Sequence, residues 1–178
     1  MNRRRLPFAA GLFAGLLLSL AAASAEPLPG QREAAEAGDA RAAFAIAIHY
    51  DTGTPTNYPE ALKWFRRSAE GGYPPGQAKL GLMYLYGWAL RPDAAEAARW
   101  YGLAAEQGFV PAQAQVGRMA ARGIGMPRDL VAAAMWTELA GNGGDAQAAW
   151  SLPRLQKKMS ADEIARAAAL AAAWRPSR

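Results

Sequence analysis

Apolar and polar positions recur along this chain with a period of 36 residues. Four kinds of position keep this interval: tryptophans, glycines, alanines and short polar residues. They are Trp64, Trp100 and Trp136; Gly72, Gly108 and Gly144; Ala61, Ala97 and Ala133; and Asn57, Asp93 and Asp129. Self-similarity at a fixed period of a few tens of residues is typical of repeat proteins. A unit this short does not fold alone, so we expect the units to stack.

We expect two helices in each unit. The second, helix B, has apolar or small residues at spacings i, i+3, i+4, i+7 and i+8, which form one stripe. In the second unit these are Ala97, Trp100, Tyr101, Ala104 and Ala105. The short polar residues that recur at the 36-residue period are expected to be the N-caps of helix B. Acidic residues three positions later predict capping boxes. The recurring glycines that follow are expected to end the helix. The predicted boxes pair Asn57 with Glu60 and Asp93 with Glu96.

Helix A, the first helix of a unit, has small residues that allow close approach of neighbouring helices, while the tryptophans fill the remaining space. In the second unit the stripe comprises Gly76, Leu80, Gly81, Met83 and Tyr84. The helix is expected to end at Gly53, Gly87 and Gly123 in successive units, and the first unit's turn is two residues shorter than the others.

Both ends of the array depart from the repeat. Residues 31–37 resemble only the last turn of a helix B, and a fourth helix A is expected from Asp145 towards Lys157, where Pro153 predicts a kink or break. Ser160 and Glu163 predict a further capping box. The final helix, with Ile164, Ala168, Ala171 and Trp174 on its apolar side, is expected to cover the last apolar face of the stack.

The first 25 residues have the pattern of a secretory signal peptide. Three arginines, at positions 3–5, precede an apolar stretch over 6–20, and Ala23-Ser24-Ala25 forms a small-residue cleavage site. We therefore expect export, to the bacterial periplasm. The alternative is an uncleaved inner-membrane anchor, because residues 6–25 are barely long enough to span a bilayer.

Charge and composition narrow the possible functions. The chain has 20 basic and 15 acidic residues, and removing the three signal arginines leaves a net charge of +2. Without a basic face or stacking motif, we expect no nucleic-acid partner. No second apolar run approaches the length of a membrane span, so we expect none after signal cleavage. Alanine makes up about a quarter of the chain, which favours helix.

The columns resemble the Sel-1-like repeat family of α/α repeats, which are related to tetratricopeptide repeats. The second unit shows this best, through Leu80-Gly81-Leu82-Met83-Tyr84, Gly87, Asp93, Ala97, Trp100-Tyr101 and Gly108; Ala89 replaces a usual turn glycine. The resemblance implies an all-α solenoid of about three helix pairs plus a C-terminal capping segment. The expected division is 1–25 signal peptide, 26–36 lead-in, 37–156 repeats (37–72, 73–108, 109–144 and a partial 145–156), and 157–178 capping helix and tail.

Catalytic signatures are weak. The tryptophans could form a ligand-stacking row, but core packing explains them more simply. His49 could act as a base, but a partly exposed groove position explains it. Asp93 and Glu96 could form an acid–base pair, but helix capping explains both. The chain has no cysteine and a single histidine, and we expect no metal, no cofactor and no enzymatic activity. Some family members are linked to β-lactam binding or hydrolysis, so a cell-envelope enzyme or ligand-binding protein remains an alternative, although those resemble cysteine-rich variants.

The resemblance implies protein–protein scaffolding, with a peptide or protein bound in the concave groove that helices A line. Two columns on helix A, together with two arginines, are the candidate binding residues: Ala45, Lys79 and Gln115; His49, Met83 and Met119; and Arg118 with Arg122. The alternative for these positions is an ordinary solvated face. A third interpretation is self-association through an unfinished end of the array, although we favour a monomer.

Overall fold

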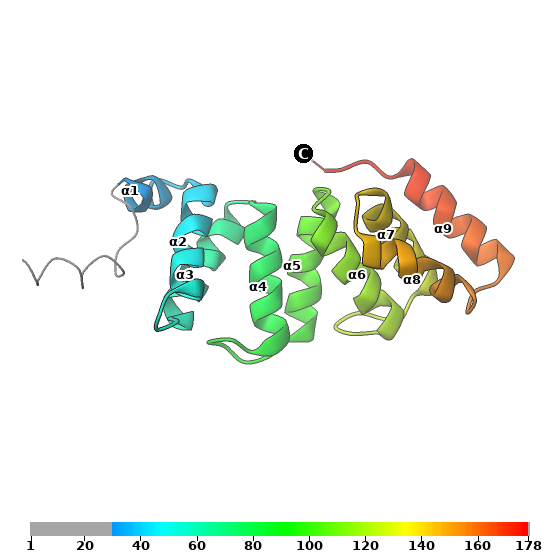
Figure 1. Cartoon of the computed structure of the whole chain (residues 1–178), viewed down its shortest axis with the longest axis horizontal. Helices are drawn as coiled ribbons and strands as arrows, with labels where there is room; N and C mark the ends of the chain where they lie inside the picture. The colour runs from blue at the N-terminus through cyan, green and yellow to red at the C-terminus, as the bar shows by residue number, and fades with distance from the viewer. Residues whose placement is uncertain (1–29, 178) are drawn as a thin grey trace, which may run out of the picture.

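The computed structural model describes residues 30–177, and within them it contains nine α-helices and no strand (Figure 1). The expected signal peptide, 1–25, lies outside the described residues. The helices are α1 Gln31–Glu36, α2 Ala40–Thr52, α3 Tyr58–Glu70, α4 Pro74–Tyr86, α5 Ala94–Glu106, α6 Val110–Arg122, α7 Leu130–Asn142, α8 Ala146–Gln156 and α9 Ala161–Ala173.

Helices α2 to α7 form three consecutive pairs, each with a helix A followed by a helix B. From α1 to α8, each helix packs against the next one in the chain, so the pairs stack side by side along one axis (Figure 1). The short α1 packs on α2, as expected for the remnant of a helix B, and α8 is the fourth helix A. The predicted all-α repeat array is therefore confirmed.

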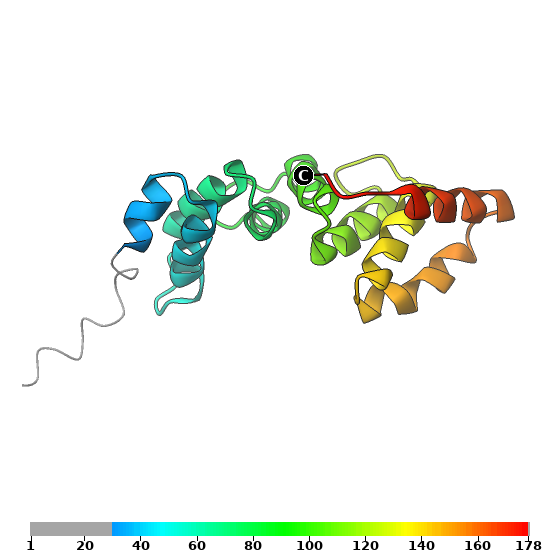
Figure 2. The same ribbon diagram turned by 90° about the horizontal axis from the view of Figure 1, so that it is seen from above.

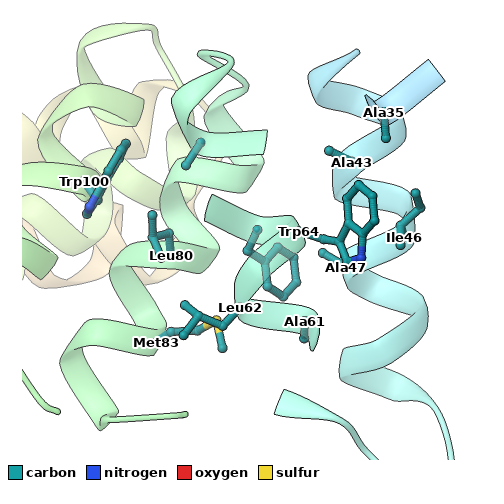
Figure 3. Packing of buried hydrophobic residues seen from close by; sticks show 12 residues of the cluster. Ala35, Ala43, Ile46, Ala47, Ala61, Leu62, Trp64, Leu80, Met83 and Trp100 are labelled. Carbon is teal, nitrogen blue, oxygen red and sulfur yellow. The ribbon is translucent and has the colours of Figure 1, made fainter. Parts of the chain in front are cut away.

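Tryptophans fill the space between helices in the first two units. Trp64 on α3 is 1% exposed and lies against Ile46 and Ala47 of α2 (Figure 3). Trp100 on α5 is also buried, whereas Trp136 is half-buried. Core packing is thus confirmed for Trp64 and Trp100. Their indole Nε1 atoms have no hydrogen-bond partner among the described residues, so apolar contact area, rather than polar pairing, holds the rings in place.

The predicted N-caps are confirmed, but the capping boxes of the repeats are wrong. Asp93 accepts hydrogen bonds from the backbone N–H groups of Ala95 and Glu96, yet its own N–H already donates to the Tyr84 carbonyl at 2.8 Å. The Glu96 carboxylate instead accepts hydrogen bonds from Arg99.

The same backbone bond recurs in the first unit. There the N–H of Asn57 donates to the Tyr50 carbonyl, and Glu60 lies 3.8 Å from Lys63. The box predicted at the last helix is confirmed, because the N–H of Ser160 is free to donate to Glu163.

The turns after helix A share one backbone geometry in the second and third units. Gly87 and Gly123 end their helices with φ of 73° and 71°, in the left-handed region where glycine has no steric penalty. Gly53, in the shorter first turn, is extended instead. Two residues further on, Ala89 adopts φ 61° where the third unit has Gly125 at φ 68°. The second turn therefore keeps the geometry of the third, with an alanine in a strained conformation.

The C-terminal helix covers the last helix B of the array. Helix α8 continues through Pro153 without a break, and α9 makes its main contacts with α7 (Figure 2). Ala167 and Ala171 face this contact, whereas Ala168 is exposed, so its predicted place on the apolar side is wrong. Helix α9 thus caps the array by folding back along the helix-B side, where it covers α7.

Residues after α9 extend this cover towards the second unit. The Trp174 ring meets Trp136 edge-on at 6.1 Å between centroids, and the N–H of Ser177 donates to the Glu106 carbonyl at 2.7 Å. The outer side of α8 stays open, and Trp150 there is 65% exposed.

Replacement of Trp64 by alanine should lower the free energy of unfolding by about 3–5 kcal/mol, because it empties a fully enclosed space. Trp150→Ala is the matched control and should change it by less than about 0.5 kcal/mol. Urea unfolding followed by circular dichroism measures both. Equal effects of the two substitutions would contradict the packing role of Trp64.

Ala89→Gly should raise the free energy of unfolding by about 1 kcal/mol, because glycine adopts positive φ without the Cβ clash. Gly125→Ala is the reciprocal change and should destabilise more strongly, since its Cβ would also overlap the Ala94 carbonyl. Chemical denaturation of both variants tests this pair. A destabilised Ala89→Gly protein would show that the turn carries no strain.

Candidate functional site

Helices A form one face of the array, and between α4 and α6 this face is hollowed. The hollow has a volume of about 350 Å³ and mostly apolar walls. We call it the apolar hollow; it is lined by Phe44, Pro75, Ala78, Lys79, Leu82, Tyr101, Phe109, Pro111, Gln115 and Arg118. Three predicted binding residues, Lys79, Gln115 and Arg118, are therefore brought together around one cavity.

The polar groups of the apolar hollow already interact with one another. Lys79 Nζ lies 3.0 Å from an Asp51 carboxylate oxygen, so its charge is largely compensated. Arg118 donates two hydrogen bonds to Gln115 Oε1, at 2.6 and 3.0 Å. The Arg118 side chain is nevertheless exposed. Unlike Lys79, it forms no ion pair with a carboxylate of the described residues.

A second hollow lies between α6 and α8, with α7 at its floor. Its volume is about 430 Å³, and a smaller hollow of about 170 Å³ adjoins it through shared residues. We call the larger one the basic hollow; it is lined by Gly117, Arg118, Ala121, Arg122, Thr137, Ser151, Arg154, Leu155 and Lys158. Arg118 belongs to both hollows, so they adjoin along the helix-A face.

The two hollows differ in the residue that helix B contributes to the floor. Thr137 occupies the position that Phe65 and Tyr101 hold in the first two units. Tyr101 fills the seam beside α4 so closely that a Cβ on Gly81 would lie 3.0 Å from its ring. Burial raises the pKa of the Tyr101 hydroxyl, which therefore stays neutral. In the third unit Thr137 takes this place, and a Cβ on Gly117 would lie 2.7 Å from its Oγ1, so the floor there carries a hydroxyl instead of an aromatic ring.

Two of the predicted binding residues are not available to a partner. Met83 and Met119 are each 1% exposed and belong to the hydrophobic core, so their assignment to the groove is wrong. Their side chains point towards the neighbouring helix B rather than outward. Ala45 is exposed and His49 half-buried, but neither lines the two hollows; the adjacent Phe44 does.

Several lining residues were not predicted from the sequence. Phe44, Phe109 and Leu82 belong to the apolar hollow, and Thr137, Arg154 and Lys158 to the basic one. A comparison of the units position by position could have found part of this set, because threonine interrupts an aromatic column. Lys158 and Arg154 occupy the positions of Arg122 and Arg118 one unit later.

The carboxylates considered as a catalytic pair have structural roles instead. Asp93 caps α5 and Glu96 pairs with Arg99 at 2.9 Å, which leaves neither carboxylate aimed at a cavity. Among residues 30–177 there is no group of three or more histidine, aspartate or glutamate side chains that could hold a metal ion. The helices within this range are also too short or too polar to cross a bilayer.

Comparison with protein families gives three matches to the Sel1 repeat, at residues 40–73, 74–109 and 110–145. These ranges coincide with the three helix pairs. A comparison with curated protein sequences gives no match.

Solved structures provide similar proteins. A Sel1 repeat protein from Oxalobacter formigenes is 37% identical, with a TM-score of 0.66, over 70% of this chain and 95% of that one. A protective antigen with an SLR fold from uropathogenic Escherichia coli, c5321, is 33% identical with a TM-score of 0.72; 79% of this chain is covered, but only 31% of the antigen. Helicobacter pylori cysteine rich protein B, at 18% identity and a TM-score of 0.56, shares the fold alone.

Proposed function

Because the chain belongs to the Sel1 repeat family, we propose that it is an exported, non-enzymatic scaffold that binds a protein or peptide through the helix-A face. Repeat scaffolds of this kind are often involved in protein binding. The observation that supports this role most directly is the apolar hollow, which is shaped by two helices A and carries polar groups at its edge. An apolar cavity with a few convergent polar groups is the usual form of a binding site.

The two faces of the array differ in how much surface they offer. On the helix-B side, α9 and the tail that reaches Glu106 cover part of the third and second units. On the helix-A side, aromatic and aliphatic side chains such as Phe44, Leu82 and Phe109 are only half-buried. A bound side chain would complete their burial, which makes them suitable anchors for a partner.

Gln115→Trp should fill the apolar hollow and weaken partner capture by about tenfold or more, because it occupies the space of the incoming side chain. Leu103→Trp is the matched control, since Leu103 is exposed on α5. In-cell crosslinking followed by quantitative mass spectrometry compares both variants with the unaltered protein, and thermal melts verify folding. Undiminished capture by Gln115→Trp, or an absence of any partner, would contradict this proposal.

A second candidate function is self-association through α8. Among the helices of residues 30–177, α8 packs mainly on α7, and its Trp150 is exposed with the Arg154 guanidinium 4.3 Å from the ring centroid. A second copy of the chain could cover this surface.

If α8 joins two copies, the mass measured by light scattering should rise with protein concentration. Trp150→Ser should abolish that rise, because the exposed ring is the main apolar group lost. A constant monomer mass over a wide dilution series would eliminate this candidate.

A further inference from the structure

We propose that the basic hollow binds the carboxylates of an acidic segment in the partner, next to an apolar side chain held in the apolar hollow. This inference rests on the proposed binding function and specifies the chemistry of the ligand. Four cationic side chains meet at one cavity of about 430 Å³: Arg118, Arg122, Arg154 and Lys158.

The repeat register shows how this charge arises. Arg118 and Arg154 occupy one position of helix A in consecutive units, where the earlier units have Ile48 and Leu82. Arg122 and Lys158 occupy the position one turn later, where the earlier units have Thr52 and Tyr86. The helix-A face therefore changes from apolar to basic along the array, and the change occurs at α6.

The four cations are not balanced by acidic groups. No carboxylate lines the hollow among the described residues, and the three ion pairs between Lys63 and Glu60, Lys79 and Asp51, and Arg99 and Glu96 all lie in the first two units. Like charges held close together repel one another and oppose folding. An anionic ligand would reduce this repulsion, and the three arginines carry planar guanidinium groups that suit carboxylates.

Favourable charge at helix C-termini accounts for three of the four cations but not for Arg118. Arg122 and Lys158 lie at or after the ends of their helices, where a positive charge complements the helix dipole. Arg154 also lies in the last turn of α8, but Arg118 lies a full turn before the end of α6, and α4 ends without any basic residue in its last turn. The equivalent helices of the array therefore fold without this charge.

The shape favours a peptide segment over other polyanions. The floor of the hollow carries the hydroxyl of Thr137, with Ser151 and Gly117 beside it, which suits a group the size of a side-chain carboxylate. Arg118 connects this hollow to the apolar one, so an extended chain could occupy both. No aromatic side chain lines the basic hollow for base stacking, as binding of a nucleic-acid strand would require.

Selection of a random phage-displayed peptide library on the purified protein tests this inference. We expect enriched peptides to combine an apolar residue with neighbouring aspartates or glutamates, and their binding to weaken with added salt. Arg118→Glu with Arg154→Glu should weaken an enriched synthetic peptide by about tenfold or more. Arg91→Glu with Arg166→Glu makes the same change in net charge at exposed sites outside the hollow and should have little effect.

Thr137→Tyr provides an independent test, because it places the aromatic side chain of the earlier units at the floor of the hollow and reduces the space for a carboxylate. It should abolish the preference for acidic peptides without lowering the melting temperature. Melting curves of the charge-reversal variants serve as folding controls.

The outcomes separate this inference from the proposed function. Enriched peptides that lack acidic residues, or that bind the charge-reversed protein equally well, would overturn the acidic ligand and leave the binding function in place. No enriched peptide at all would count against both. Binding to phosphatidylglycerol vesicles that the charge reversal abolishes, without acidic peptides, would assign the hollow to a lipid headgroup instead.

Discussion

The structure depends on one packing arrangement, in which a bulky aromatic side chain from helix B is enclosed by small residues of the adjoining helices. Trp64 is 1% exposed, while the alanines around it, such as Ala47 and Ala61, are fully buried. Alanine lets the backbones approach closely, and the indole fills the space that remains. A single pair of helices offers only part of this enclosure, so each unit is stable only beside its neighbours.

The candidate site follows from a local departure from that arrangement. In the third unit Thr137 replaces the aromatic residue of the earlier units, and Gly117 of α6 accommodates its hydroxyl. The helices stay in place because the neighbouring contacts of α6 with α7 and of α7 with α8 are retained. A repeat array can thus present hollows of different chemistry on one face by changing the side chains that line them.

The ends of the array decide which face is available. Helix α9 packs on α7, and Ser177 extends the cover to Glu106, so the helix-B side of the second and third units is partly occupied. The helix-A face has no such cover among the described residues, and both hollows open on it. The C-terminal segment therefore stabilises the last pair while leaving the proposed binding surface free.

The amino-acid sequence by itself determined the helices, their pairing and most of their ends, because these depend on interactions within a few residues. The 36-residue period located each helix pair, and the short polar residues at its start marked the N-caps. Only the tertiary structure decided what depends on contacts between distant residues: the N–H of Asp93 is taken by Tyr84 of the preceding helix, which removes the expected capping box. Likewise, Met83 is buried, and Arg154 and Arg118 line one hollow, because of how neighbouring helices stack. The 36-residue period alone does not predict these contacts between helices.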